Sequence, residues 1–253
     1  MNIKLPICTF LGALMLTACS SHYQLAGVQR TRIIVDDRYD ANPDAAATAI
    51  LAPYKHQVDS VMGPVVGVVA HDMEADRPES CLSNLLSDIL IWASAEYGET
   101  PVLGIYNMGG IRASLLKGEV TYGDVLDIAP FENKIAFTTL SGETLLKLFR
   151  QIAHRGGEGV SHGCELVISQ QGELLSARLH GQEIDPQADY RLATIDYLLG
   201  GNDGMSAMNE GRDVKSPQDV RNNTRFIIMD YFKEKAAKGE PVAAKVEGRI
   251  KMQ

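Results

Sequence analysis

The segment that decides the fold lies near the middle of the chain and reads Val102-Leu103-Gly104-Ile105-Tyr106-Asn107-Met108-Gly109-Gly110-Ile111-Arg112. Its first five residues are mostly apolar, which is typical of a short buried strand. The paired glycines let the backbone turn sharply or approach a ligand closely, and Arg112 offers a planar donor suited to a phosphate or carboxylate. The strand is therefore followed either by a ligand-binding turn or by a tight turn with a surface arginine.

Helices and strands mix on both sides of this segment. Before it, the apolar spacing predicts a helix over 45–62, a strand over 65–70 and a helix over about 80–97. After it, we expect helices over 121–128, 141–154 and 217–235, and strands over 134–140, 165–169, 174–179, 190–195 and 244–250. This mixture predicts one α+β domain. A dinucleotide-binding fold is not supported, because no G-x-G-x-x-G joins a strand to a helix.

Composition limits the possible partners. The 253 residues carry a formal net charge of −8, and lysine and arginine form no basic run. A nucleic-acid partner is therefore not expected. Small anions stay possible, because a few placed arginines or helix N-termini can hold a phosphate in an acidic protein.

The N-terminus resembles an export signal. Lys4 precedes an apolar stretch from Leu5 to Leu16, which is too short to span a bilayer and is typical of a signal peptide. Because Leu16-Thr17-Ala18-Cys19 resembles a bacterial lipobox, we expect a signal peptide over 1–18, lipid on Cys19, a tether over 19–43 and a domain over 44–253. The chain would then be exported and anchored to the membrane, facing the periplasm rather than the cell surface. An ordinary secretory signal, with Cys19 incidental, is the alternative.

Two further features of the sequence stay open. Within the tether, Arg30–Val35 forms either a short edge strand or part of a flexible spacer. Of the four cysteines, Cys81 and Cys164 remain in the folded body. Export permits a disulfide between them, but two separate thiols are equally compatible with the spacing.

A self-sufficient catalytic centre is not recognisable. The six histidines are far apart in the sequence, with no H-E-x-x-H or H-x-H spacing. His71-Asp72 is the nearest approach to a ligand pair and is better explained as two polar residues at a strand end. G-x-S-x-G and Walker loops are also absent. We therefore predict no catalytic residue and no metal ligand in this sequence.

Two further loops carry residues suited to binding. In Pro130-Phe131-Glu132-Asn133, an aromatic ring could stack on a flat ligand whose edge the amide reads; the alternative is a core phenylalanine. In the loop from Asp196 to Gly204, Tyr197 precedes a flexible turn containing Gly201 and Asp203. Asp203 could accept two ribose hydroxyls, or simply satisfy the backbone of the turn.

In this order, the three loops resemble the C-terminal domain of the 5′-nucleotidase family, which includes periplasmic UDP-sugar hydrolases. The similarity runs from about Ala45 to the C-terminus. It includes Glu79-Ser80-Cys81-Leu82-Ser83-Asn84-Leu85, Tyr122-Gly123-Asp124-Val125 and Tyr190-Arg191-Leu192-Ala193-Thr194. The resemblance implies a single mixed α/β domain of that type, with layered sheets flanked by helices.

The resemblance also implies a substrate site. A base would stack between Phe131 and Tyr197, Asn133 would contact its edge, and Asp203 would accept the ribose hydroxyls. Asn107 and Arg112 would lie on the phosphate or ribose side. The remaining members of the implied site are Asn84, Gly109, Gly110 and Gly201.

Two departures from the family matter. Between Arg77 and Lys117 the only basic residue is Arg112, so a second phosphate-binding arginine near the Ser80 helix is not expected. The family's metallophosphatase domain has no counterpart in this sequence. We therefore expect the nucleotide-binding half of a split phosphohydrolase, with no cofactor in this chain. A separately encoded metallophosphatase would carry the divalent metals. The alternatives are a non-catalytic nucleoside- or nucleotide-binding lipoprotein and an interaction protein with a vestigial pocket.

Overall fold

The computed structural model describes residues 25–253, so the predicted signal peptide and Cys19 lie outside the described residues. The chain divides into two units, residues 1–51 and residues 52–253. In the first unit, residues 25–35 have no regular secondary structure, so the edge strand considered for Arg30–Val35 does not form. A short 3-10 turn, η1 (Asp37–Tyr39), follows.

Helix α2 (Ala45–Met62) begins in the first unit and ends in the second, at the bounds the apolar spacing predicts. Its apolar stripe faces solvent, for Tyr54 and Val58 are 66% and 55% exposed. In the part of the chain that the structure describes, no helix is long and apolar enough to cross a membrane.

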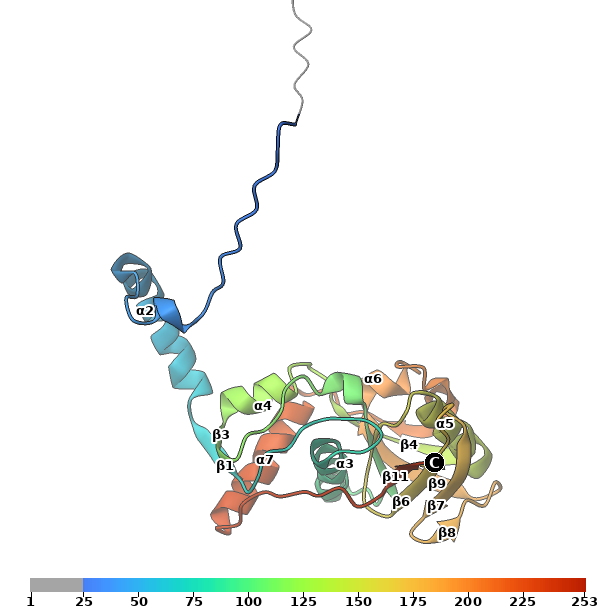
Figure 1. The fold of residues 1–253 in the computed structure, drawn as a ribbon. Coiled ribbons are helices and arrows are strands. Elements are labelled where there is room, and N and C mark those ends of the chain that lie inside the picture. The colour runs from blue at the N-terminus through green and yellow to red at the C-terminus, as the bar shows by residue number, and fades with distance from the viewer. Residues whose placement is uncertain (1–24) are drawn as a thin grey trace, which may run out of the picture. The chain divides into compact units, whose positions relative to one another are not determined.

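Helices and strands are mixed along the chain of the second unit (Figure 1). The helices are α3 (Cys81–Ala93), α4 (Tyr122–Ile128), α5 (Gly142–His154), α6 (Asp196–Leu199) and α7 (Thr224–Ala237), with 3-10 turns η2 (Ser94–Tyr97), η3 (Met108–Gly110), η4 (Ser206–Glu210) and η5 (Val220–Asn222). The strands are β1 (Val65–Val69), β2 (Leu103–Tyr106), β3 (Gly118–Thr121), β4 (Ile135–Ser141), β5 (Gly159–Val160), β6 (Cys164–Ile168), β7 (Leu174–Leu179), β8 (Gln182–Glu183), β9 (Asp189–Ile195), β10 (Arg212–Lys215) and β11 (Ile250–Met252).

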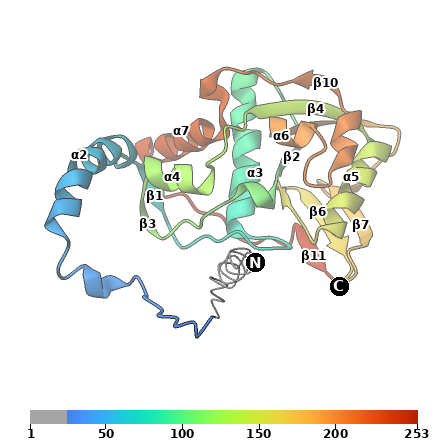
Figure 2. The same ribbon diagram turned by 90° about the horizontal axis from the view of Figure 1, so that it is seen from above.

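Three sheets and the helices between them build the unit. The central sheet has the order β10-β4-β9-β2-β5, a second has the order β11-β6-β7-β8, and β1 pairs with β3. Helix α3 packs against β2 and β5, α7 packs against α3 and β1, and α5 contacts both β4 and β7 (Figure 2). The predicted mixed class, with sheets flanked by helices, is confirmed.

Local sequence signals explain where the main helices begin. Ser80 accepts a hydrogen bond from the Ser83 amide and forms a capping box with it, which satisfies amides at the start of α3. Ser141 caps α5 by accepting a hydrogen bond from the Thr144 amide. At the far end of η2, Gly98 adopts a left-handed conformation that ends the helical segment.

Two predicted boundaries are wrong because tertiary contacts override the local pattern. The helix expected over 217–235 begins only at Thr224, since Asn223 bridges to Lys134 and the Thr224 amide donates to the Asn133 carbonyl. The strand expected over 244–250 is confined to β11. Before it, the Glu247 amide donates to the Glu79 carboxylate instead of to a neighbouring strand.

Cys81 and Cys164 are both free, so of the two possibilities the separate thiols are found. Cys164 is buried at the start of β6, and this burial raises the pKa of its thiol. A buried thiol of this kind behaves as a small apolar side chain.

Candidate functional site

The three loops singled out in the sequence meet at one edge of the central sheet. Strands β2 and β9 are parallel neighbours, so the loops that follow them, beginning at Asn107 and at Asp196, leave the sheet at the same edge. Strand β4 runs antiparallel to β9 with Ile135 opposite Ile195, which brings the loop before β4 to that edge too. The sheet topology therefore explains why residues from distant parts of the chain become neighbours.

These loops surround a cavity of about 140 Å³. Its lining residues, all from the predicted site, are Asn107, Gly109, Gly110, Phe131, Asn133, Tyr197 and Asp203. Two hydrogen bonds join the loop before β4 to the loop after β9. The Asp196 amide donates to the Lys134 carbonyl, and the Lys134 amide donates to the Asp196 carboxylate at 3.0 Å. The residues next to Asn133 and Tyr197 are thus held together at the edge of the sheet.

The polar side of the cavity centres on Asp203. The Asn107 side-chain amide donates to Asp203 Oδ2 at 2.6 Å, and the Tyr197 hydroxyl donates to Oδ1 at 3.2 Å. Burial, followed by the charge of Asp203, raises the pKa of Tyr197. Asn107 is 3% exposed, and among residues 25–253 its Oδ1 atom has no hydrogen-bond partner. A ligand donor could satisfy this buried oxygen.

The backbone around the cavity requires small residues and an unusual conformation. A Cβ atom on Gly110 would lie 2.5 Å from Asn107 Oδ1, so a side chain there would displace the amide. Asp203 has a φ of 54°, a left-handed conformation that aspartate tolerates better than most residues. Gly201 does not line the cavity, but its φ of 71° forms the turn that carries Asp203.

The aromatic side of the cavity is open. Phe131 is 47% exposed and Tyr197 is 39% exposed, so neither ring belongs to the core. Within the described part of the chain, neither ring packs against another aromatic ring. Exposed rings at the mouth of a cavity can stack on a flat ligand, because aromatic faces attract each other in offset or stacked arrangements.

The structure does not bring every predicted residue to the cavity. Arg112 is exposed and donates to the Gly109 carbonyl at 3.4 Å, so it lies beside the paired glycines without lining the cavity. Asn84 is 1% exposed on α3, where its amide donates to the Glu79 carboxylate and to the Lys245 carbonyl. These contacts place Asn84 in a second polar network.

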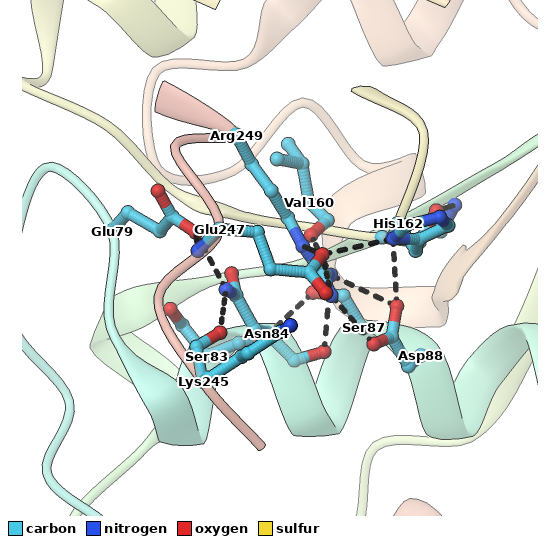
Figure 3. A network of polar contacts seen from close by, with 12 residues as sticks. Glu79, Ser83, Asn84, Ser87, Asp88, Val160, His162, Lys245, Glu247 and Arg249 are labelled. Carbon is cyan, nitrogen blue, oxygen red and sulfur yellow. Dashed lines mark hydrogen bonds and ion pairs between the residues drawn. The ribbon is translucent and has the colours of Figure 1, made fainter. Parts of the chain in front are cut away.

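Figure 3 shows this second network, which ties the C-terminal segment to α3. The Arg249 guanidinium is 4% exposed and donates to both carboxylate oxygens of Asp88, at 2.9 and 2.7 Å. Its Nε donates to Glu247, whose carboxylate also contacts the His162 ring. The sequence indicated none of this, since Arg249 is a lone arginine in a segment predicted to be a strand.

A third set of polar contacts, centred on Glu158, lies beside the cavity and was not predicted from the sequence. The Glu158 carboxylate is fully buried and accepts hydrogen bonds from Arg77 and Arg155, both at 2.6 Å. It also accepts from the Met108 amide, in the turn that lines the cavity. The only signal in the sequence is a single acidic residue between glycines, in Gly156-Gly157-Glu158-Gly159.

The arrangement can hold a flat ligand with hydroxyl and amide groups. It offers two ring faces, one carboxylate acceptor, two side-chain amides and the exposed Arg112. In the described residues, no group of three or more His, Cys, Asp or Glu could hold a metal ion. The ring faces, the carboxylate and the amides around the cavity are groups suited to binding a ligand.

Comparison with known proteins gives this cavity a family context. Residues 65–210 match the family described as "5′-nucleotidase, C-terminal domain". The chain is 27% identical over 240 residues to the trifunctional nucleotide phosphoesterase protein YfkN of Bacillus subtilis, covering 86% of this chain and 16% of that protein. It is also 27% identical over 206 residues to protein UshA of Yersinia enterocolitica, covering 79% of this chain and 36% of that protein.

A solved structure agrees with these matches. The 5′-nucleotidase precursor from Thermus thermophilus superposes with a TM-score of 0.72 at 26% identity, covering 82% of this chain and 43% of that one. The chain thus spans less than half the length of each of these relatives. Because the family match covers more than half of its residues and includes the loops around the cavity, this chain belongs to the family of the 5′-nucleotidase C-terminal domain.

Proposed function

We propose that the cavity binds the nucleoside portion of a nucleotide. The base stacks between Phe131 and Tyr197, Asn133 contacts its edge, and Asp203 accepts hydrogen bonds from the ribose hydroxyls. The observation that carries this proposal is the convergence of these four side chains, from two loops far apart in the sequence, on one cavity whose two rings face solvent. Glycines at 109 and 110 leave room beside them for the sugar and its substituents.

The energetics favour binding over a purely structural role for these residues. Stacking on an aromatic side chain contributes about 1–3 kcal/mol per base. A fold gains little from rings that remain 47% and 39% exposed, because stabilisation by burial grows with the apolar area removed from water. Arg112, exposed beside the paired glycines, is available to attract the phosphate.

For catalysis, we propose a reaction shared with a second protein. This chain would hold a 5′-nucleotide or UDP-sugar while a separately encoded metallophosphatase hydrolyses it to nucleoside and phosphate. The names of the relatives support a phosphoesterase reaction. The described residues do not fit a divalent-metal centre, so no catalytic step is assigned to them. The partner's metals would supply the activated water, and this chain would bind and orient the substrate.

We also propose that lipid on Cys19 anchors the protein to a bacterial membrane, facing the periplasm. The sequence Leu16-Thr17-Ala18-Cys19 supports this, with polar residues directly after it. Metabolic labelling with a radioactive fatty acid should mark the wild-type chain and leave Cys19→Ala unlabelled. Equal labelling of both would contradict the anchor.

The nucleotide-binding proposal is tested by calorimetric titration. The full chain in mild detergent is titrated with adenosine, AMP and UDP-glucose, beside Phe131→Ala and Tyr197→Ala. We expect saturable binding by the wild type. In each variant the free energy of binding should be weaker by about 1–3 kcal/mol, because each substitution removes one ring on which the base stacks. Tyr54→Ala, an exposed aromatic on α2, is the control and should bind like the wild type. Absence of binding by the folded wild type would contradict the proposal.

The shared reaction needs a separate experiment. Pull-down with the wild-type chain should recover a metallophosphatase whose hydrolysis of AMP accelerates when the chain is added, and Phe131→Ala should not accelerate it. Tight nucleoside binding with no effect on that rate would instead identify a nucleotide-binding protein without catalysis.

A further inference from the structure

The buried carboxylate of Glu158 joins the walls of the nucleotide cavity. Its side chain is fully buried, and its Oε1 atom accepts hydrogen bonds from Arg77 Nη2 and Arg155 Nε, both at 2.6 Å. The other oxygen, Oε2, accepts from the Met108 amide at 2.6 Å. Charge-assisted hydrogen bonds of this length are among the strong ones in proteins.

The bond from the Met108 amide to Glu158 holds the turn that lines the cavity. Met108 lies between Asn107 and Gly109, which both face the cavity. The Met108 amide is at the start of η3, so its bond to Glu158 holds the backbone of that turn from behind. The neighbouring Asn107 side chain in turn donates to Asp203.

The ion pair of Glu158 with Arg155 fixes the position of a positive charge near the turn that carries Asp203. A Cβ atom on Gly204 would lie 3.9 Å from Arg155 Nη1, which places this guanidinium beside the turn that carries Asp203. Burial alone would lower the pKa of Arg155, but the hydrogen bond and charge of Glu158, together with the charge of Asp203, raise it. Asp203 is thus the second carboxylate whose field acts on Arg155.

The three neighbours of Glu158 all require acceptor oxygens. Both arginines and the Met108 amide are donors. A glutamine of the same shape has one acceptor oxygen and one donor NH₂ group. Whichever way it is turned, its NH₂ faces a donor, so at least one contact breaks.

We propose that Glu158 is a positioning residue of the nucleotide cavity. It fixes the Asn107–Gly110 turn through the Met108 amide, and it pairs with Arg155, which then does not pair with Asp203. The Asp203 carboxylate therefore stays available to the hydroxyl groups of the ligand. Without Glu158, Arg155 pairs with Asp203, because an arginine–carboxylate contact outcompetes a bond from a neutral hydroxyl. This role rests on the proposed nucleoside binding at the same cavity.

The test compares Glu158→Gln with a matched control. Glu99 forms a similar pair away from the cavity, its Oε2 accepting from Arg191 Nε at 2.8 Å, so Glu99→Gln removes one charge of the same type. Adenosine is titrated calorimetrically into the full chain in detergent, well below the unfolding midpoint of each variant. We expect both variants to unfold at lower temperature, but only Glu158→Gln to lose affinity, by about tenfold or more.

A second substitution isolates the effect of Arg155. Adding Arg155→Gln to Glu158→Gln should recover part of the lost affinity, because residue 155 can then no longer pair with Asp203. Arg155→Gln alone keeps the Met108 contact with Glu158 and should bind adenosine within about threefold of the wild type. This single variant also tests the proposal if Glu158→Gln fails to fold.

Three results would overturn the role of Glu158. They are wild-type affinity in folded Glu158→Gln, an equal loss in Glu99→Gln, and a tenfold loss in Arg155→Gln alone, which would make Arg155 a direct ligand contact. Absence of adenosine binding by the wild type as well as the variants would instead refute the nucleoside site, and the proposed role with it. The two failures are therefore distinguishable.

Discussion

Replacing Asp203 with asparagine tests the sugar side of the cavity. Asparagine has nearly the same shape and also tolerates the φ of 54° found at this position. Asn107 Oδ1 has no partner in the described part of the chain and can accept from the new NH₂ group after a small rotation. We therefore expect the free energy of unfolding to change by less than about 1 kcal/mol.

Ligand affinity should change much more. The carboxylate offers charge-assisted acceptors to the ribose hydroxyls, and one such hydrogen bond contributes about 1.5–3 kcal/mol. Asp203 is only half-buried, so water weakens the contact and the lower value applies. A loss of about 1.5 kcal/mol raises the Kd of adenosine about tenfold.

Two comparisons make this prediction specific. Titration with 2′,3′-dideoxyadenosine, which lacks the 2′- and 3′-hydroxyls, should give the same affinity for the wild type and Asp203→Asn. Asp213 shares the positive φ, at 52°, but lies on β10 away from the cavity, so Asp213→Asn should bind adenosine normally. An equal loss for both ligands, or no loss for adenosine, would refute the assignment of Asp203 to the sugar.

Three other substitutions test individual contacts of the fold, one of them in the cavity. Arg249→Met should lower the free energy of unfolding in urea by about 2–3 kcal/mol, because it leaves a carboxylate without its buried partner; unchanged adenosine affinity is also expected. Gly110→Ala should weaken adenosine binding and destabilise the fold by about 1–3 kcal/mol, since its Cβ would lie 2.5 Å from Asn107 Oδ1; normal binding would contradict the cavity geometry. The hydrogen bond from Arg191 lowers the pKa of Glu99, so the pair stabilises the fold above the ordinary glutamate pKa and loses this effect as pH falls. Glu99→Gln should therefore show a smaller loss of stability than the wild type between about pH 5 and pH 3, measured by urea unfolding.

Much of the secondary structure could be predicted because its signals are local. Helix α2 occupies the predicted 45–62, and α4 and α5 lie within one residue of their expected bounds. Apolar spacing and side-chain caps act over three or four residues, so they can be read directly from the sequence. The two displaced boundaries, at Thr224 and before β11, are places where partners from other parts of the chain take the backbone hydrogen bonds.

The residues that line the cavity could be predicted from the sequence, but the contacts that hold them in place could not. Phe131, Asn133, Tyr197 and Asp203 stand out because a packed core has no need of such residues in loops. The structure brings them together through the pairing of β4 and β2 with β9. Asn84 had the right residue type, but the tertiary structure engages it with Glu79 and Lys245 instead.

The sequence by itself determined the mixed α+β class, the capped helices and the loops that carry binding residues, because these depend on the spacing of near neighbours. Only the tertiary structure decided how those loops meet and which charged residues hold them. Glu158 reaches Met108 across 50 positions, and Arg249 reaches Asp88 across 161. A buried charge requires a partner but places no limit on how far away in the sequence that partner lies, so such pairs form only once the sheet has brought their segments together.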